Sequence, residues 1–211
     1  MIITRQKPME EIEEMTKPFR KLFIVGCGTC STSCQTGGEE QVAEMAEKLG
    51  DKVIGTTVVE EPCDRRIDRR DLKPHKEAIN EADAILVMSC GSGVQTVAEF
   101  TGKVVLPALD TLFIGQTERI GRYHDTCRAC GECILDETAG ICPLTRCPKA
   151  LLNGPCGGQV KGKCEVGEYE FDCAWVKIWE RLKEQDRLDL FMTFRPPRDY
   201  GKKSLIRDHI F

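Results

Sequence analysis

The sequence has few aromatic residues, few histidines and no long hydrophobic run. Aromatic side chains make up 6% of the 211 residues. The longest apolar runs fall far short of the roughly 20 residues that a membrane-spanning helix requires, so no membrane span is expected. Positive charge is not in excess either, because 30 Lys and Arg stand against 34 Asp and Glu. With a net charge of −4, a general binder of nucleic acid or anionic membranes is not expected.

Familiar catalytic motifs are also missing. The sequence has no evident Ser/His/Asp constellation, glycine-rich phosphate loop or flavin-binding pattern. Its histidines lie apart beside charged residues, as surface histidines do: His75, His124 and His209. The Gly26-Cys27-Gly28 segment is similar to the start of a dinucleotide-binding loop, but Ser31 stands where the third glycine is needed. Dinucleotide binding by this loop therefore stays as an alternative hypothesis.

Cysteine, in contrast, is abundant, with 13 residues in the chain. Residues 1–20 carry clustered glutamates and no continuous apolar core, so we expect no secretory signal and a cytoplasmic protein. In a reducing cytoplasm, clustered cysteines indicate metal or redox sites more often than disulfides, and an odd number excludes complete pairing. The sequence therefore predicts metal sites.

Alternating helix and strand patterns predict a Rossmann-like α/β domain at residues 20–118, after an N-terminal extension at residues 1–19. Strands are expected at residues 21–25, 53–59, 84–88 and 103–106. Helices are expected at residues 36–49, with a capping-box spacing of Thr36 and Glu39, and at residues 74–81 and 94–100. This alternation indicates right-handed βαβ crossovers and a mostly parallel sheet.

The composition changes after this domain. Cys, Gly and Pro dominate residues 119–174, which predicts a cysteine-rich, ferredoxin-like metal-binding domain without a periodic core of its own. Residues 175–211 are expected to form a C-terminal helix and a tail. One face of that helix carries Trp175, Ile178, Trp179 and Leu182. This face and the tail at 191–211 are predicted docking surfaces for a partner, with packing of the helix on its own domain as the alternative.

The first cysteine set belongs to the α/β domain: Cys27, Cys30, Cys34, Cys63 and Cys90. Cys27, Cys63 and Cys90 each follow a predicted strand. Because the carboxyl ends of parallel strands meet at one edge of the sheet, we expect these thiols to converge there. Four of the five thiolates could hold a [4Fe–4S] cluster. Which of Cys27 and Cys63 is a ligand stays open, since a single cysteine is often just a buried apolar residue.

The second set lies in the cysteine-rich domain: Cys127, Cys130, Cys133, Cys142, Cys147, Cys156, Cys164 and Cys173. The Cys-x2-Cys-x2-Cys run at its start is typical of ferredoxins, in which a remote cysteine, commonly before proline, supplies the fourth ligand. Eight cysteines match two four-ligand sites. The four-residue gap between Cys142 and Cys147 also suits zinc, so two [4Fe–4S] clusters and one cluster with one zinc are both kept.

These segments resemble a known family. The resemblance rests on Cys127–Cys133, Gly140-Ile-Cys142-Pro143, Cys147-Pro-Lys149, Leu151-Leu-Asn153-Gly-Pro-Cys156-Gly-Gly158, Lys163-Cys164-Glu165 and Asp172-Cys173-Ala-Trp175. They are similar to the methylenetetrahydrofolate reductase C-terminal domain family. With the Gly26–Cys34 segment, the whole chain resembles the separate small iron–sulfur subunit of the acetogen-type enzyme.

The resemblance implies a partner and a role. The partner would be a flavin-containing (β/α)8 large subunit that reduces methylenetetrahydrofolate in one-carbon (acetyl-CoA pathway) metabolism, with further electron-transfer subunits as additional partners. This chain would hold two or three [4Fe–4S] clusters, or a zinc in place of one, and relay electrons to or from the flavin without a folate-reducing site of its own. The alternative is a zinc-stabilised assembly subunit of the same complex without a redox role.

Overall fold

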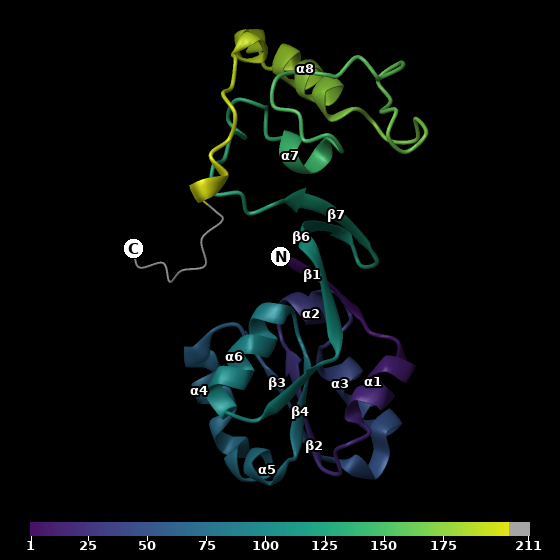
Figure 1. Cartoon of the computed structure of the whole chain (residues 1–211), viewed down its shortest axis with the longest axis vertical. Helices are drawn as coiled ribbons and strands as arrows, with labels where there is room; N and C mark the ends of the chain where they lie inside the picture. The colour runs from purple at the N-terminus through teal and green to yellow at the C-terminus, as the bar shows by residue number, and fades with distance from the viewer. Residues whose placement is uncertain (203–211) are drawn as a thin grey trace. The chain divides into compact units, whose positions relative to one another are not determined.

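A computed structural model describes residues 1–202, which fall into two compact units. Unit 1 is Met1–His124, and unit 2 begins at Asp125. The helices and strands of unit 1 are β1 (Ile2–Gln6), α1 (Met9–Thr16), β2 (Leu22–Cys27), α2 (Cys30–Ser33), α3 (Glu39–Leu49), β3 (Val53–Val59), α4 (Arg65–Asp71), α5 (Lys76–Glu81), β4 (Ala84–Met88), α6 (Gly91–Thr101), β5 (Val104–Pro107) and β6 (Leu109–Arg119) (Figure 1). Strand β7 (Arg122–Cys127) runs across the boundary, and unit 2 contains α7 (Pro143–Arg146) and α8 (Ala174–Glu184). Short 3-10 turns are η1 (Gly50–Lys52), η2 (Lys73–His75), η3 (Leu188–Met192) and η4 (Tyr200–Lys202).

A four-stranded parallel sheet of order β3-β2-β4-β5 forms the centre of unit 1 and confirms the predicted α/β fold. All residues of β2 and β4 are buried, as expected for strands covered on both faces. Successive side chains of β2 point to opposite faces of the sheet. Phe23 packs with residues of α5 and α6, whereas Ile24 packs with residues of α1 and α3. Figure 1 shows these helices on opposite sides of the sheet.

Residues 1–19, expected to be an extension, contribute β1 and α1 to unit 1. Strand β1 pairs antiparallel with β6, from Ile2 opposite Ile114 to Gln6 opposite Leu109. In α1, Ile12 is fully buried in the same cluster as the residues of α3. The sequence did not predict β1 because a short strand is stabilised mainly by its pairing with another strand, which local sequence does not encode.

Two helices also differ from the prediction. Helix α3 begins after Gly38 rather than Thr36, and the side-chain oxygen of Gln41 accepts a hydrogen bond from the Gly38 N–H at 3.2 Å. Helix α4 was not expected, because its sequence is mostly Arg and Asp and shows little apolar periodicity. Asp64 caps its first turn.

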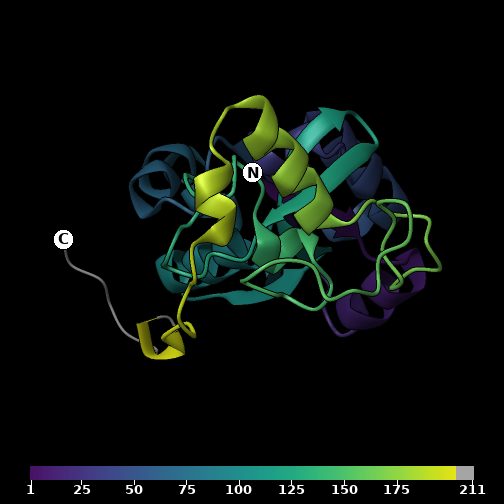
Figure 2. The same cartoon turned by 90° about the horizontal axis from the view of Figure 1, so that it is seen from above.

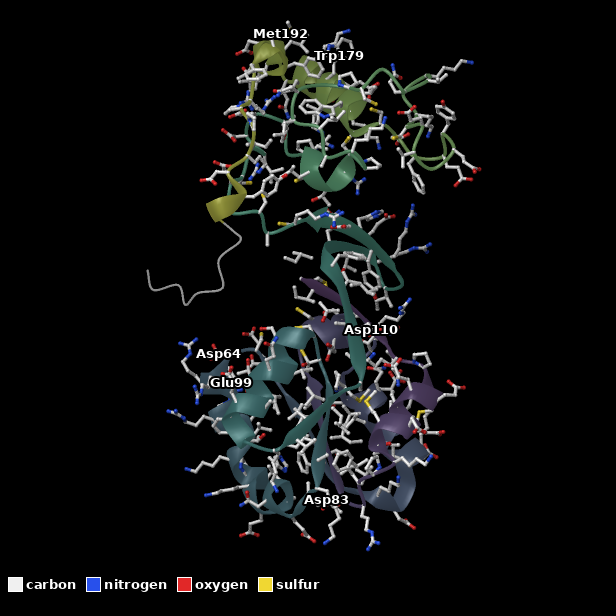
Figure 3. All side chains as sticks on the ribbon, viewed as in Figure 1. Asp64, Asp83, Glu99, Asp110, Trp179 and Met192 are labelled. Carbon is white, nitrogen blue, oxygen red and sulfur yellow. The ribbon has the colours of Figure 1, made fainter. Side chains whose placement is uncertain are left out.

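Unit 2 has a small core built around α8. Trp175, Ile178 and Leu182 are 1%, 0% and 0% exposed, and they pack with Ala139. The predicted docking role of this helix face is therefore wrong for these three side chains, which pack within their own unit. Of the predicted face, only Trp179 remains exposed, and it is labelled in Figure 3. Within residues 1–202, no helix has both the length and the apolar character needed to cross a membrane.

Candidate metal centres

Three cysteines of unit 1 follow three neighbouring strands of the parallel sheet. Cys27 is the last residue of β2, Cys63 lies between β3 and α4, and Cys90 is the N-cap of α6, two residues after the end of β4. Cys27 and Cys90 are buried, whereas Cys63 is exposed at the surface. The fold thus places them at the carboxyl edge of the sheet, where open α/β sheets bind their ligands.

The thiols at this edge influence one another electrostatically. Partial desolvation by surrounding protein atoms raises the pKa of the Cys63 thiol, and negative charge on Cys90 and on Cys27 raises it further. Several thiolates at one place repel each other unless a cation compensates them. The chemistry of this donor set therefore fits a metal that binds thiolates.

Of the other two cysteines of unit 1, Cys30 begins α2 and Cys34 is its C-cap, and both lie against β1. The N–H of Ile2 donates to Sγ of Cys30 at 3.5 Å, and the thiol of Cys34 contacts the carbonyl oxygen of Ile2 at 3.8 Å. Cys34 is buried, and Cys30 is partly exposed. The contacts of both sulfurs are thus with the backbone of β1.

Four of the eight cysteines in unit 2 line a single small cavity with a volume of about 20 Å³. They are Cys147, Cys156, Cys164 and Cys173. Cys147 is the C-cap of α7, and Cys173 is the N-cap of α8. Short backbone bridges tie the loop between the last two cysteines: the N–H of Cys164 donates to Phe171 and that of Cys173 to Gly162. In kind and number, these four thiols match the ligand set of either a [4Fe–4S] cluster or a zinc ion.

A charged pair lies beside this cavity. Nζ of Lys149 is 3.5 Å from Sγ of Cys156 and forms an ion pair with Glu165. The hydrogen bond from Lys149 holds the pKa of Glu165 below its ordinary value. Nearby, Lys163 and Lys177 lower the pKa of Asp172 to about 2. The loop that carries these cysteines thus bears three lysine–carboxylate ion pairs.

The remaining four cysteines are Cys127, Cys130, Cys133 and Cys142. Between the first three the backbone turns through left-handed residues, Ala129 at φ 46° and Gly131 at φ 77°. The Ala129 N–H donates to Sγ of Cys127 at 3.3 Å, as backbone amides do in tight cysteine turns. Cys142 is the N-cap of α7, and Thr145 Oγ1 lies 3.5 Å from its sulfur. Helix α7 thus separates Cys142 from Cys147, which lines the cavity.

The structure groups the cysteines by region but does not bring them to metal-coordinating distances. Within residues 1–202, no three His, Cys, Asp or Glu side chains come close enough together to hold a metal ion. The sequence identified the cysteines but not the cations beside them. Lys149 follows Cys147-Pro148 and could have been suspected from that proximity. Arg198 contacts Cys130 from 68 residues away, and the sequence gives no signal for that contact.

Comparisons with known proteins bear on this second region. Residues 106–201 match a protein-family model described as methylene-tetrahydrofolate reductase C terminal. The matched segment contains all eight cysteines of unit 2 and none of the five of unit 1. No curated protein and no solved structure matches the chain. The match confirms the resemblance seen in the sequence for this segment and supports a subunit related to methylenetetrahydrofolate reductase.

Proposed function

Starting from the family match of residues 106–201, we propose that this chain is an electron-transfer subunit of a heteromeric methylenetetrahydrofolate reductase. The observation that carries the proposal is the cavity lined by Cys147, Cys156, Cys164 and Cys173, inside the matched segment. Four thiols are, in kind and number, the ligands of a [4Fe–4S] cluster, which supplies one-electron transfer when bound. The partner would be a flavin-containing large subunit that carries the folate site.

The residues of this chain would bind the clusters, orient their ligands and compensate their charge. The four cysteines of unit 2 that do not line this cavity would form a second ligand set: Cys127, Cys130, Cys133 and Cys142. The thiols at the sheet edge of unit 1 are a third candidate site. Lys149 and the backbone amides around the cysteines would stabilise negative charge on the sulfurs.

Metal analysis tests the proposal directly. The chain is purified without oxygen, and its iron, acid-labile sulfide and zinc are measured against protein. We expect iron and sulfide in near-equal amounts, at about four or more of each per chain. Stoichiometric zinc without sulfide would contradict electron transfer and leave the zinc-stabilised assembly subunit.

Single Cys→Ser variants test the grouping of ligands. Cys156→Ser and Cys164→Ser should each remove the same cluster signal in electron paramagnetic resonance, because both residues line one cavity. Cys130→Ser should remove a different signal. Reduction of methylenetetrahydrofolate should persist in all three when the partner's flavin is reduced by dithionite, since the substrate chemistry is expected on the flavin.

Cys34→Ser is the corresponding variant in unit 1 and should affect neither signal of unit 2. Loss of folate reduction at a fully reduced flavin in any of these variants would show that the cysteines do more than relay electrons.

A further inference from the structure

The segment after α8 is fastened to unit 2 by Arg195. This side chain is 6% exposed, its Nε donates to Glu137 at 2.7 Å, and its guanidinium lies 5.7 Å from the ring centre of Trp175. The side chain of Asn153 binds the Arg195 backbone on both sides: its Oδ1 accepts from the N–H at 2.7 Å, and its Nδ2 donates to the carbonyl at 2.8 Å. This network fixes both the position and the direction of the chain at residue 195.

Two prolines then lead from Arg195 to Arg198. Proline fixes its own φ near −65° and restricts the residue before it, so Pro196 and Pro197 form a stiff spacer. The next side chain is therefore delivered to a defined place. Figure 2 shows this segment, in yellow, leaving the end of α8.

Arg198 ends at a cysteine of the Cys-x2-Cys-x2-Cys loop. Its Nη2 lies 3.0 Å from Sγ of Cys130 and also donates to the carbonyl oxygen of Glu132. The Glu132 carboxylate is 3.7 Å away, and the Arg198 side chain is only 6% exposed. A guanidinium shielded from water and in contact with sulfur interacts with negative charge far more strongly than one in solvent.

We infer that Arg198 is a positioning residue that sets the charge balance of the site containing Cys130, and that Glu132 opposes it. The inference rests on the proposed function, because it concerns a redox cluster held by that loop. An electron accepted by the site adds one negative charge. A cation at a ligand sulfur favours this reduced state and raises the reduction potential, whereas a neighbouring carboxylate lowers it.

The cavity lined by Cys147, Cys156, Cys164 and Cys173 also has a cation in contact with a cysteine sulfur. Lys149 contacts Cys156 and is paired with Glu165, so the same arrangement of cation, sulfur and carboxylate occurs there. The two cations come from different parts of the chain and touch different cysteines. Each should therefore act on one site alone.

The experiment is a redox titration of the anaerobically purified complex, with dithionite as reductant and electron paramagnetic resonance as the readout. Arg198→Gln should shift the midpoint potential of one signal to more negative values, and Arg198→Lys should shift it less. Glu132→Gln should shift the same signal to more positive values. Lys149→Gln should lower the potential of the other signal only. Arg146→Gln, which removes an exposed positive charge from the same unit, should shift neither signal.

The outcomes separate the inference from the proposed function. If iron and sulfide are present but Arg198→Gln and Arg198→Lys leave both potentials unchanged, the inference is overturned and the electron-transfer function stands. Shifts of the same sign in Arg198→Gln and Glu132→Gln would indicate mere loosening of the segment and would also overturn it. An equal shift in Arg146→Gln would show a general charge effect of the unit and would contradict a specific role of Arg198. If the wild-type chain contains no sulfide, both proposals fall.

Discussion

Asp68 is a carboxyl group buried without a partner. The side chain is fully buried on α4, and no residue of the described chain donates a hydrogen bond to either of its oxygens. Burial, followed by the negative charges of Asp71 and Asp64, raises the pKa of Asp68 to about 7. Unit 1 therefore folds most favourably with this group protonated.

The resulting prediction is a pH-dependent cost to the stability of unit 1. In the unfolded chain Asp68 ionises near pH 4, whereas in the folded chain it keeps its proton up to about pH 7. Its contribution to stability is thus complete below pH 4 and is lost as the pH rises to 7. The free energy of unfolding of Asp68→Asn relative to wild type should increase by up to roughly 4 kcal/mol over this range. Denaturant unfolding at several pH values measures it.

Asp83 provides a control of the opposite sign. The backbone N–H groups of Arg20 and Lys21 each donate to its carboxylate at 2.9 Å and hold its pKa below the ordinary value. Asp83→Asn should therefore lower stability at neutral pH, and its effect should fade as the pH falls through the acid range. A pH profile of Asp68→Asn parallel to that of wild type would show that Asp68 is not the titrating group.

At the scale of single residues, the sequence predicted positions better than contacts. Cys27, Cys63 and Cys90 could be placed at one sheet edge because each follows a strand of a parallel sheet. The cavity that groups Cys147 with Cys173 could not be predicted, because loops rich in Gly and Pro carry no periodic signal. The contact of Arg198 with Cys130 depends on the path of a long segment that local sequence does not encode.

Among the elements that the structure describes, the segment that follows α8 carries the apolar side chains with the largest exposed fractions. Met192 is 83% exposed and Phe194 is 77% exposed, and Met192 is labelled in Figure 3. The anchored Arg195 holds their backbone in place. Part of the predicted docking tail, residues 203–211, lies outside the described residues.

Charge placed on this segment should weaken binding to the proposed large subunit. Phe194→Asp and Met192→Asp should each raise the dissociation constant roughly tenfold or more, because apolar anchors dominate protein interfaces. Thr193→Asp adds the same charge between them at an exposed polar position and should have a much smaller effect. Copurification and binding kinetics with the partner provide the measurement. If all three variants bind the partner as tightly as the wild-type chain does, the interface lies elsewhere.

The elements of unit 1 were largely predictable, with identifiable exceptions. Strands β2, β3, β4 and β5 carry β-branched or aliphatic runs bounded by Gly, Pro or charged residues, and all four were predicted close to their observed ranges. Helix α4 was not predicted because a highly charged helix lacks an apolar stripe. Strand β1 was not predicted because it is stabilised by pairing with β6, which is distant in the sequence.

For the whole molecule, the two units should differ in their dependence on metal. Unit 1 has two hydrophobic clusters around a four-stranded sheet, whereas the described residues of unit 2 form one cluster with four buried members. Under the proposed function, metal binding supplies much of the folding free energy of unit 2. Chelation or exposure to oxygen should make residues 125–202 sensitive to trypsin while a fragment near residues 1–124 survives. Equal resistance of both units before and after metal loss would contradict this prediction.

The pairing of β6 with β1 also bears on how such proteins can be recombined. The family match begins at residue 106, within β5, so the stretch shared with relatives includes β6. Five residues of β6 are paired with β1, which the match leaves out. A gene fusion joined at residue 106 would carry a strand with an unpaired edge, prone to association with other chains. A junction at residue 125 would keep β6 paired with β1 but would divide β7, which pairs with the other edge of β6.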